Sequence, residues 1–393
     1  AVMRRIISVL PALLSQHIAP RLAQKPTIIK AVYATSWFAG SKRRMDSLID
    51  LIGRTELNAV VIDIKDYSGI VGYRTNIPEV KQYRADEARI ADMNGLIARL
   101  HEKKIYVIGR IAVFQDQRLV AARPELALKN KETGGVWRDR KGLGWIDPSV
   151  PEAWEYNIEI AKDALARGFD EINFDYIRFA SDGDIQNIAY PFWDEKRPMA
   201  AIIEDFFKFA GARLRTAVIS ADLFGLATID EGDLGIGQRL EAAIPHFGAV
   251  APMVYPSHYQ SGFSGYANPA AYPYQVVRRS LEAALRRIER YGLQSASTSE
   301  PSAVPQLRPW LQDFDLGASY DAEKVRAQIQ AVYDTFCSRE LRESPAAAAV
   351  AVSAVFEPLQ ACSETIAEGN SLFGGWMLWS PSNVYTEEAL LRE

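Results

Sequence analysis

The stretch EINFDYIRFASDG, residues 171–183, decides the fold class. Residues 171–174 have the short, apolar character of a buried strand, and polar residues follow from Asp175 onward. An amphipathic stretch at residues 152–167 comes before it, and Gly168 is a helix stop signal. A helix leading into a short buried strand is the repeating unit of a parallel α/β sheet. The segment therefore predicts one such unit.

The same alternation recurs along the whole chain. Strands are predicted at residues 29–35, 59–64, 105–112, 171–174, 217–221, 249–254, 307–311 and 375–379. Helices are predicted at residues 45–53, 93–103, 152–167, 202–215, 238–247, 276–291 and 322–336. Eight strands are enough to close a barrel, and no GxGxxG follows the first strand, as a dinucleotide-binding open sheet would require. We therefore predict a single (β/α)8 TIM barrel over residues 29–393, after an N-terminal extension of residues 1–28.

Three connections are longer than ordinary loops, at residues 115–151, 179–198 and 257–274. All three follow predicted strands, so a barrel would place them at its C-terminal face, where active sites lie. A fourth long segment, residues 338–369, precedes the last strand. We expect this insertion on the opposite face, in a structural role.

Composition bounds the function class. The 393 residues are 48% hydrophobic and carry a net charge of −4, which argues against disorder and against a nucleic-acid binder. Neither Cys337 nor Cys362 lies in a CxxC pattern, and the four histidines lack metal-ligand spacing. We expect no metal and no cofactor. Whether the two cysteines form a disulfide or remain buried thiols stays open.

The first residues suggest export. No apolar run of about 18 residues occurs, so no membrane span is expected. Residues 3–5 are Met-Arg-Arg and residues 6–14 are largely apolar, the layout of a short signal peptide. An amphipathic N-terminal helix fits the same residues equally well. We expect an exported protein of the periplasm, cell envelope or extracellular space.

Carboxylates recur where predicted strands stop. Burying several of them in a barrel mouth costs several kcal/mol each unless they are paired or hydrogen-bonded. Glycoside hydrolysis supplies a reason, because it needs two carboxyl groups across the glycosidic bond. Asp175 is the first candidate, with Asn173 on the same face by the period-2 rule and Arg178 close enough to hold it ionised. Asp222, on the next strand, is the candidate acid/base, and Asp313 is the alternative acid.

Both leading candidates have structural alternatives. Asp175 and Arg178 would also suit an ion pair that braces the barrel rim, and Asp222 would suit a helix cap. Residues that we expect to bind substrate follow the other strand ends or lie beside these acids: Asp63, Lys65, Arg110, Asn173, Arg178, Tyr255, His258, Tyr259, Gln312, Trp379 and Asn383. For Asp63 and Lys65, with Asp66, a self-neutralising charge cluster is an equal alternative.

At these strand ends the sequence resembles a known family. The segments are VVIDIKDYSG (60–69), IYVIGRIAVFQD (105–116), WIDPS (145–149), EINFDYIRFASDG (171–183), ISADLFG (219–225), APMVYPSHY (251–259), RPWLQDF (308–314) and GWMLWSPSNVY (375–385). Together they resemble a bacterial family of glycosyl hydrolase-like TIM barrel domains, related to alpha-amylase and alpha-galactosidase barrels. The sequence departs from the family in its 338–369 insertion and in Ala180, where relatives often have Pro.

The resemblance implies that Asp175 and Asp222 occupy the places of a catalytic aspartate and an acid/base. The leading hypothesis is a retaining glycosidase that acts on a bacterial polysaccharide or cell-envelope glycan. The first alternative is a non-catalytic carbohydrate-binding barrel, in which these acids are locked in salt bridges. A second alternative is a metal-dependent hydrolase that uses Asp63, Asp175 and Asp222 as oxygen ligands. No protein partner is predicted.

Overall fold

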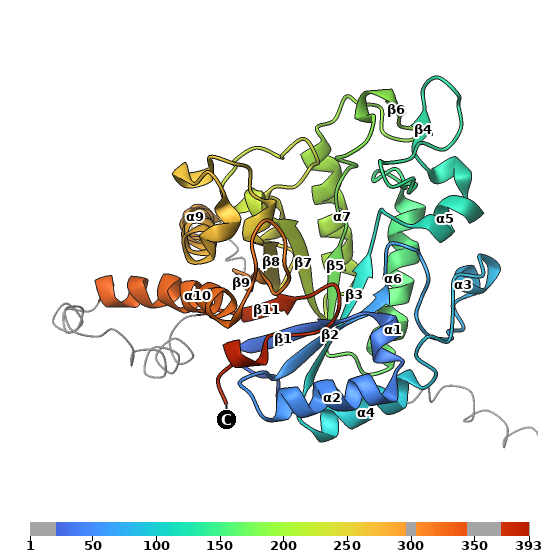
Figure 1. The fold of residues 1–393 in the computed structure, drawn as a ribbon. Coiled ribbons are helices and arrows are strands. Elements are labelled where there is room, and N and C mark those ends of the chain that lie inside the picture. The colour runs from blue at the N-terminus through green and yellow to red at the C-terminus, as the bar shows by residue number, and fades with distance from the viewer. Residues whose placement is uncertain (1–20, 296–303, 344–370, 393) are drawn as a thin grey trace, which may run out of the picture.

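The computed structural model describes residues 21–295, 304–343 and 371–392. It is a ring of parallel strands wrapped by helices (Figure 1). The strands are β1 (Ile29–Ala34), β2 (Ala59–Lys65), β3 (Tyr106–Ala112), β4 (Lys129–Asn130), β5 (Glu171–Asp175), β6 (Ile188–Ala189), β7 (Val218–Phe224), β8 (Ala249–Met253), β9 (Gln306–Leu307), β10 (Trp310–Gln312) and β11 (Gly375–Trp379). The helices are α1 (Ser36–Ala39), α2 (Lys42–Gly53), α3 (Pro78–Gln82), α4 (Met93–Glu102), α5 (Gln117–Ala122), α6 (Pro151–Ala166), α7 (Met199–Arg213), α8 (Leu240–Ala243), α9 (Pro273–Ser295) and α10 (Ala322–Glu343).

The main sheet closes on itself. Its strand order is β10-β11-β1-β2-β3-β5-β7-β8-β9, and Trp310 of β10 also pairs in parallel with Met253 of β8. Strands β9 and β10 share the seventh position, so eight positions complete the ring. The predicted (β/α)8 barrel is confirmed, and each of the eight predicted strands forms.

The seventh barrel position differs from the prediction of one continuous strand. It breaks at Arg308 and Pro309, between β9 and β10. Proline has no N–H to donate to the ladder, so regular pairing stops there. Arg308 is buried and pairs with Glu171 inside the barrel, at the end opposite to the strands' C-termini. The seventh barrel position therefore contributes two buried side chains to the interior: Arg308 toward the amino end of the barrel and Trp310 toward the carboxyl end.

The seven predicted helices form in the predicted order, but three of them differ clearly in length. Helix α9 starts three residues earlier and ends four residues later than predicted. Helix α8 is only four residues long, shorter than the predicted helix at residues 238–247, although Ile244, the residue before Pro245, keeps a helical conformation. Helix α10 continues to Glu343, so residues 338–343 of the expected insertion are helical, and the rest of that insertion lies outside the described residues. Cys337 is buried in α10, whereas Cys362 lies outside the described residues.

Two of the long loops meet. Strand β4, from the loop after β3, pairs antiparallel with β6, from the loop after β5. This small sheet stands beyond the barrel at the top of Figure 1. It ties together the two loops that flank Asp175 in sequence. Residues 21–28 of the predicted extension reach the barrel, where the Leu22 amide donates to Asp170 (2.7 Å). Residues 1–20 lie outside the described part.

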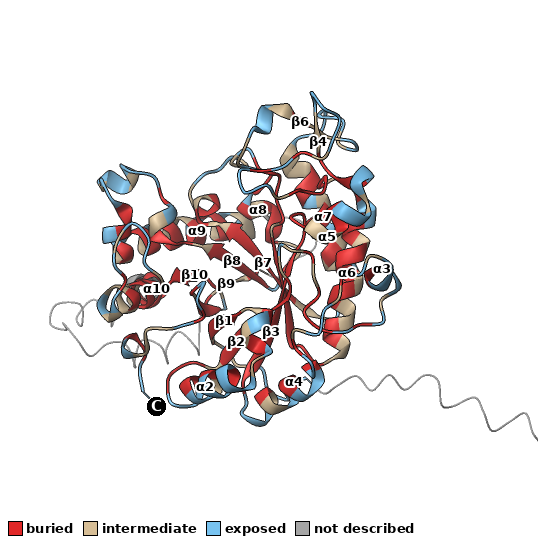
Figure 2. Cartoon of the chain, turned by 45° about the vertical axis from the view of Figure 1, so that its right-hand side comes forward, coloured by how far each residue is buried: buried red, intermediate tan, exposed pale blue. Residues whose placement is uncertain are grey.

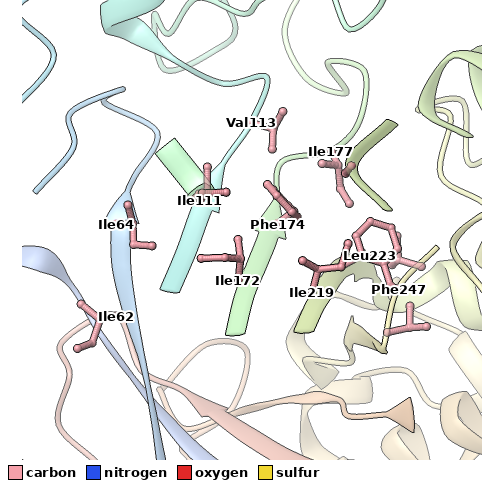
Figure 3. Close-up of a cluster of buried hydrophobic side chains, with 14 of the residues drawn as sticks. Ile62, Ile64, Ile111, Val113, Ile172, Phe174, Ile177, Ile219, Leu223 and Phe247 are labelled. Atoms are coloured by element: carbon pink, nitrogen blue, oxygen red, sulfur yellow. The ribbon is translucent and has the colours of Figure 1, made fainter. Parts of the chain in front are cut away.

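Burial follows a period of two along the strands. Ile172 and Phe174 of β5, and Ile219 and Leu223 of β7, belong to the layer between the strands and the surrounding helices (Figure 3). The alternate residues of each strand face the barrel interior, where a second apolar cluster includes Tyr33, Tyr255 and Trp310. Figure 2 shows the buried strands at the centre and exposed residues on the outer helices and loops. Among the described residues, no helix is long and apolar enough to cross a membrane.

Candidate active site

A cavity of 530 Å³ opens at the carboxyl ends of the barrel strands. Its lining residues come from β3, β5, β7, β8, β10, β11 and the loops that follow them: Arg110, Lys141, Asp175, Tyr176, Arg178, Asp222, Phe224, Gly225, Leu226, Met253, Tyr255, His258, Tyr259, Trp310 and Trp379. A larger cavity of 710 Å³ lies between residues 21–27 and α4, at the amino end of β3. Barrel enzymes carry their chemistry at the carboxyl ends of the strands, so the smaller cavity is the candidate active site.

Arg110 on β3 lies at the centre of the buried charges in this cavity. Its Nη1 donates to Asp63 (2.7 Å) and its Nη2 to Asp175. Its Nε lies 3.8 Å from Oδ2 of Asp222 and has no hydrogen-bond partner among the described residues. The side chains of Arg110, Asp63 and Asp222 are all at least 90% buried. One cation therefore faces three carboxyl groups contributed by three strands.

The environment of Asp222 favours its protonated form. Its Oδ1 accepts from Asn173 (2.8 Å) and from the indole N–H of Trp310 (2.8 Å), whereas Oδ2 has only the distant Arg110. Burial raises the pKa of Asp222 well above its ordinary value, and the nearby charge of Asp175 raises the pKa further. These two causes outweigh Arg110 and both hydrogen bonds, which lower the pKa.

Asp175 is held by an ion pair and by a backbone hydrogen bond. Oδ2 accepts from Arg110, and Oδ1 accepts from the backbone N–H of Tyr176 (2.6 Å). Tyr176 has a φ of 53°, a left-handed conformation that is costly for an aromatic residue. Such strain persists where the surrounding structure enforces it, typically at functional sites. Here it accompanies the turn that aims an amide at the carboxylate.

Comparison with known proteins decides the family. Residues 31–341 match the family described as "Putative glycosyl hydrolase domain". The chain belongs to this family. A hypothetical protein from Ruminiclostridium thermocellum ATCC 27405 is 41% identical over 49% of this chain and 96% of its own length, with a TM-score of 0.46. No match to a curated protein was found. The predicted resemblance is confirmed.

Two solved structures of glycoside hydrolases are similar to this glycosyl hydrolase domain, and the first of them supports its fold. The PgaB (BpsB) glycoside hydrolase domain from Bordetella bronchiseptica has a TM-score of 0.54 at 15% identity, over 91% of this chain and 95% of that one. The alpha-galactosidase TtGalA from Thermus thermophilus has a TM-score of 0.48 at 15% identity, over 81% of this chain and 58% of that one. At 15% identity, the likeness to the PgaB (BpsB) domain shows the barrel fold and not the substrate.

Four of the aromatic or imidazole side chains predicted at strand ends line the cavity: Tyr255, His258, Tyr259 and Trp379. The Trp379 ring stacks on Tyr33, with 3.9 Å between ring centroids, and Arg110 lies 5.0 Å from the Trp379 ring centre. Burial lowers the pKa of His258, which favours its neutral form. The hydroxyl of Tyr259 bonds to Ser280 (2.7 Å), so this side chain offers the cavity mainly its ring. Their role in binding sugar remains a prediction.

Lys65 does not line the cavity. It is fully buried, and its ammonium group forms an ion pair with Asp116 (2.5 Å). The ladder between β2 and β3 shifts register between Asp63 and Lys65, so the two do not share one alignment. Asp63 is also absent from the lining and bonds to Tyr33 and Arg110. The predicted self-neutralising cluster does not form either, because each of its residues pairs with a charge outside it: Asp63 with Arg110, Lys65 with Asp116 and Asp66 with Arg89.

Three further predicted residues brace the cavity from outside its wall. Asn173 donates to Ser220 (3.1 Å) and Asp222. Gln312 accepts from the amide of Ser257 (3.2 Å) and donates to the carbonyl of Phe314 (2.9 Å).

Asn383 accepts from Thr35 through both amide (3.1 Å) and hydroxyl (3.0 Å). None of these three residues, Asn383, Asn173 and Gln312, lines the cavity. The geometry therefore does not support direct contact between them and a substrate.

Asp313, the alternative acid, is engaged away from the cavity. Its oxygens accept from the amide (2.9 Å) and hydroxyl (2.7 Å) of Thr386. Gln312 lies inside the barrel, so the next residue points outward by the alternation of strand residues. Burial raises the pKa of Asp313, but the carboxyl group has no access to the cavity that holds Asp175.

Arg178 was expected to hold Asp175 ionised, and this expectation is wrong. Arg178 lines the cavity, but it forms no ion pair with Asp175; Arg110 does. The chain turns at Tyr176, so proximity in sequence does not become contact. The guanidinium group of Arg178 instead packs 4.6 Å from the ring centre of Trp145 and 4.8 Å from that of Phe224.

Sequence reasoning missed two residues that touch the buried acids. Trp310 donates to Asp222, and Tyr33 donates to Asp63. Both face the barrel interior, and Trp310 lies two residues before Gln312, so period-2 alternation carried the signal. Among the described residues, no cluster of His, Cys, Asp and Glu could hold a metal ion. Asp63, Asp175 and Asp222, offered as metal ligands by one alternative, surround the Arg110 guanidinium instead.

Proposed function

We propose that the domain is a retaining glycosidase that acts on a bacterial polysaccharide or cell-envelope glycan, with Asp175 as nucleophile and Asp222 as general acid/base. The observation that carries the proposal is the contrast between two carboxyl groups on either side of Arg110. Asp175 is ion-paired and accepts an amide hydrogen bond, whereas burial and a neighbouring negative charge raise the pKa of Asp222. Opposed environments of this kind separate an acid from a nucleophile.

The chemistry follows in two steps. In the first, a carboxylate oxygen of Asp175 attacks the anomeric carbon while Asp222 gives its proton to the leaving glycosidic oxygen. The products are a glycosyl ester of Asp175 and an ionised Asp222. In the second step, Asp222 takes a proton from water, the water oxygen attacks the anomeric carbon, and Asp175 leaves as a carboxylate. Asp222 is then protonated again, and the atoms balance.

Arg110 supports both steps through its position. When Asp175 becomes an ester it loses its negative charge, and Arg110 keeps Asp63 as its partner (2.7 Å). When Asp222 becomes ionised, Arg110 is the nearest cation, with Nε 3.8 Å from Oδ2. The cation therefore faces one or another ionised carboxylate throughout the cycle. This arrangement stabilises the negative charge on Asp175 before the first step and on Asp222 after it.

A hydrolysis screen tests the proposal. Purified protein is incubated with bacterial exopolysaccharides and envelope glycans, and new reducing ends are measured. We expect activity on at least one glycan and its loss, by at least about 10³-fold, in both Asp175→Asn and Asp222→Asn. Asp313→Asn is the matched control, since Asp313 also ends a barrel strand but lies outside the cavity. Full activity of Asp175→Asn would sink the assignment.

The first-formed product distinguishes the stereochemical outcome. A retaining enzyme releases a sugar with the anomeric configuration of its substrate, which NMR detects before mutarotation. Inverted product would remove the nucleophile role of Asp175 while leaving hydrolysis intact.

We also propose that the protein is exported, for which the charged and then apolar layout of residues 3–14 is the support.

One observation favours a second function, a non-catalytic carbohydrate-binding barrel. Asp175 is engaged by Arg110, as a locked carboxylate would be. Such a protein would bind a glycan without releasing reducing ends, and Asp175→Asn would leave binding unchanged. Binding by the wild-type protein with no hydrolysis across the panel would support this function over the first.

A further inference from the structure

Arg178 is a buried cation without a carboxylate partner. Its exposed fraction is 9%, and it lines the cavity beside Asp175. Within the described ranges, no Asp or Glu oxygen lies within 4.0 Å of its guanidinium nitrogens, in contrast to Arg110. Its Nη1 donates to the carbonyl of Phe179 (3.0 Å) and to the hydroxyl of Ser181 (3.0 Å). No protein acceptor for Nε or Nη2 is found in that same part of the chain.

The guanidinium group is held in place by packing. Trp145, from the loop after β3, and Phe224, at the end of β7, contact it with ring centres 4.6 and 4.8 Å away. Burying a cation without a counter-ion costs several kcal/mol, and contact with aromatic rings returns only part of that cost. Burial lowers the pKa of Arg178, which reflects the same cost.

The carboxylates of Asp175, Asp182 and Asp139 are near enough to act on Arg178 through their charge, but within the described ranges none of them forms an ion pair with it. Asp175 is paired with Arg110. Asp139 accepts from the side chains of Gln115 (2.9 Å) and Trp145 (3.0 Å). Lys141 also lines the cavity and adds a further positive charge to its wall. Arg178 therefore has negative charges in its vicinity but, among the described residues, no carboxylate in direct contact with its guanidinium group.

We propose that the substrate is an acidic polysaccharide, and that a hexuronic acid carboxylate binds Arg178 in the subsite next to Asp175. The planar fork of a guanidinium group matches a carboxylate and forms two parallel hydrogen bonds to it. Lys141 strengthens the same interaction as a point charge. This inference rests on the proposed function for its choice of a glycan, but it concerns binding and not bond cleavage.

Calorimetric titration of the full chain tests the proposal. The probes are oligosaccharides of D-glucuronate and of D-galacturonate, each compared with its carboxyl-reduced, neutral counterpart. We expect the wild-type protein to bind at least one uronate oligosaccharide about tenfold more tightly than the neutral form. Equal or tighter binding of the neutral forms, or no binding of any uronate probe, would overturn the proposal.

Variants locate the preference. Arg178→Gln should abolish the preference for the uronate, Arg178→Lys should retain part of it, and Lys141→Gln should reduce it about threefold. Arg140→Gln is the matched control, because Arg140 is an exposed cation of the same loop that does not line the cavity. A preference that survives Arg178→Gln, or that falls equally in Arg140→Gln, would overturn the proposal.

Two features keep these tests independent. Lys141 is exposed, so Lys141→Gln leaves the fold intact even if Arg178→Gln does not fold, which thermal unfolding reveals. Binding of uronate without any hydrolysis would sink the proposed glycosidase and leave this inference standing. Hydrolysis of a neutral glycan with no uronate preference would do the reverse.

Discussion

The guanidinium group of Arg110 on β3 forms an ion pair with the carboxylate of Asp175 at the end of the neighbouring strand β5. The register places Arg110 beside Asn173 and Ala112 beside Asp175, so the long arginine side chain reaches two residue pairs further along the strand. The pair is therefore a product of strand order and register. Arg110 also partly balances the negative charge of the other buried acids, because the same cation faces Asp63 and Asp222.

Removing this cation should destabilise the fold. In Arg110→Met the buried carboxylates of Asp63 and Asp175 lose their common partner, and we expect the free energy of unfolding to fall by about 3–5 kcal/mol. Urea denaturation measures the change. Arg140→Gln, which removes an exposed cation, should stay within about 0.5 kcal/mol of wild type. A loss below about 1 kcal/mol in Arg110→Met would contradict the central role of Arg110.

Asp222 should make stability depend on pH with a definite sign. Its pKa is raised in the folded protein, so the folded state holds this proton more tightly than the unfolded chain does. The resulting stabilisation is present below the ordinary pKa of about 3.9 and is lost as the pH rises through the raised value. Asp222→Asn should remove the pH-dependent stabilisation that Asp222 contributes. The contribution of Asp63, whose pKa is also raised by burial, should remain. Denaturation midpoints measured between about pH 4 and about pH 9 check this prediction. An unchanged dependence of the midpoint on pH in the variant would refute it.

Trp310 should tune the acid. Its indole N–H donates to Oδ1 of Asp222 (2.8 Å) and lowers the pKa of that carboxyl group. Trp310→Phe keeps an aromatic ring but loses the donor, so the alkaline limb of kcat/KM should move to higher pH by about one unit. The pH profile of hydrolysis is the readout. Trp379→Phe serves as control, because Trp379 also lines the cavity but makes no hydrogen bond to Asp222; a shift of equal size there would count against the assignment.

Lys65 should prove structural. It is fully buried with Asp116 (2.5 Å), and Asp116 also caps α5 through the amide of Leu119 (2.7 Å). In Lys65→Met a buried carboxylate is left without its cation, so we expect a loss of about 3–5 kcal/mol in unfolding free energy. Hydrolysis per folded molecule should change by less than about threefold. A selective rise in KM without loss of stability would instead restore the predicted role in substrate binding.

Sequence patterns carried the architecture and part of the site. Alternation of short apolar and longer amphipathic stretches predicted eight strands, and all eight form the barrel. Because strand residues alternate between two faces, the same pattern placed Asp175 and Asn173 on one face of the strand, and the structure places Ile172 and Phe174 on the other. The same alternation could also have identified Trp310 as an inward-facing residue. These features depend on spacing of two or of 3.6 residues, which is local and readable along the chain.

Partnerships between strands were decided only by the tertiary structure. Arg178 lies three residues after Asp175, yet Arg110, 65 positions before Asp175, is its partner. Asp313 ends a barrel strand as Asp175 does, yet it bonds to Thr386, 73 positions away. The physical reason is that a carboxylate's pairing depends on the register of neighbouring strands and on where a loop turns. The sequence determined which acids reach the barrel mouth, and the closed sheet decided which of them share one cation and one cavity.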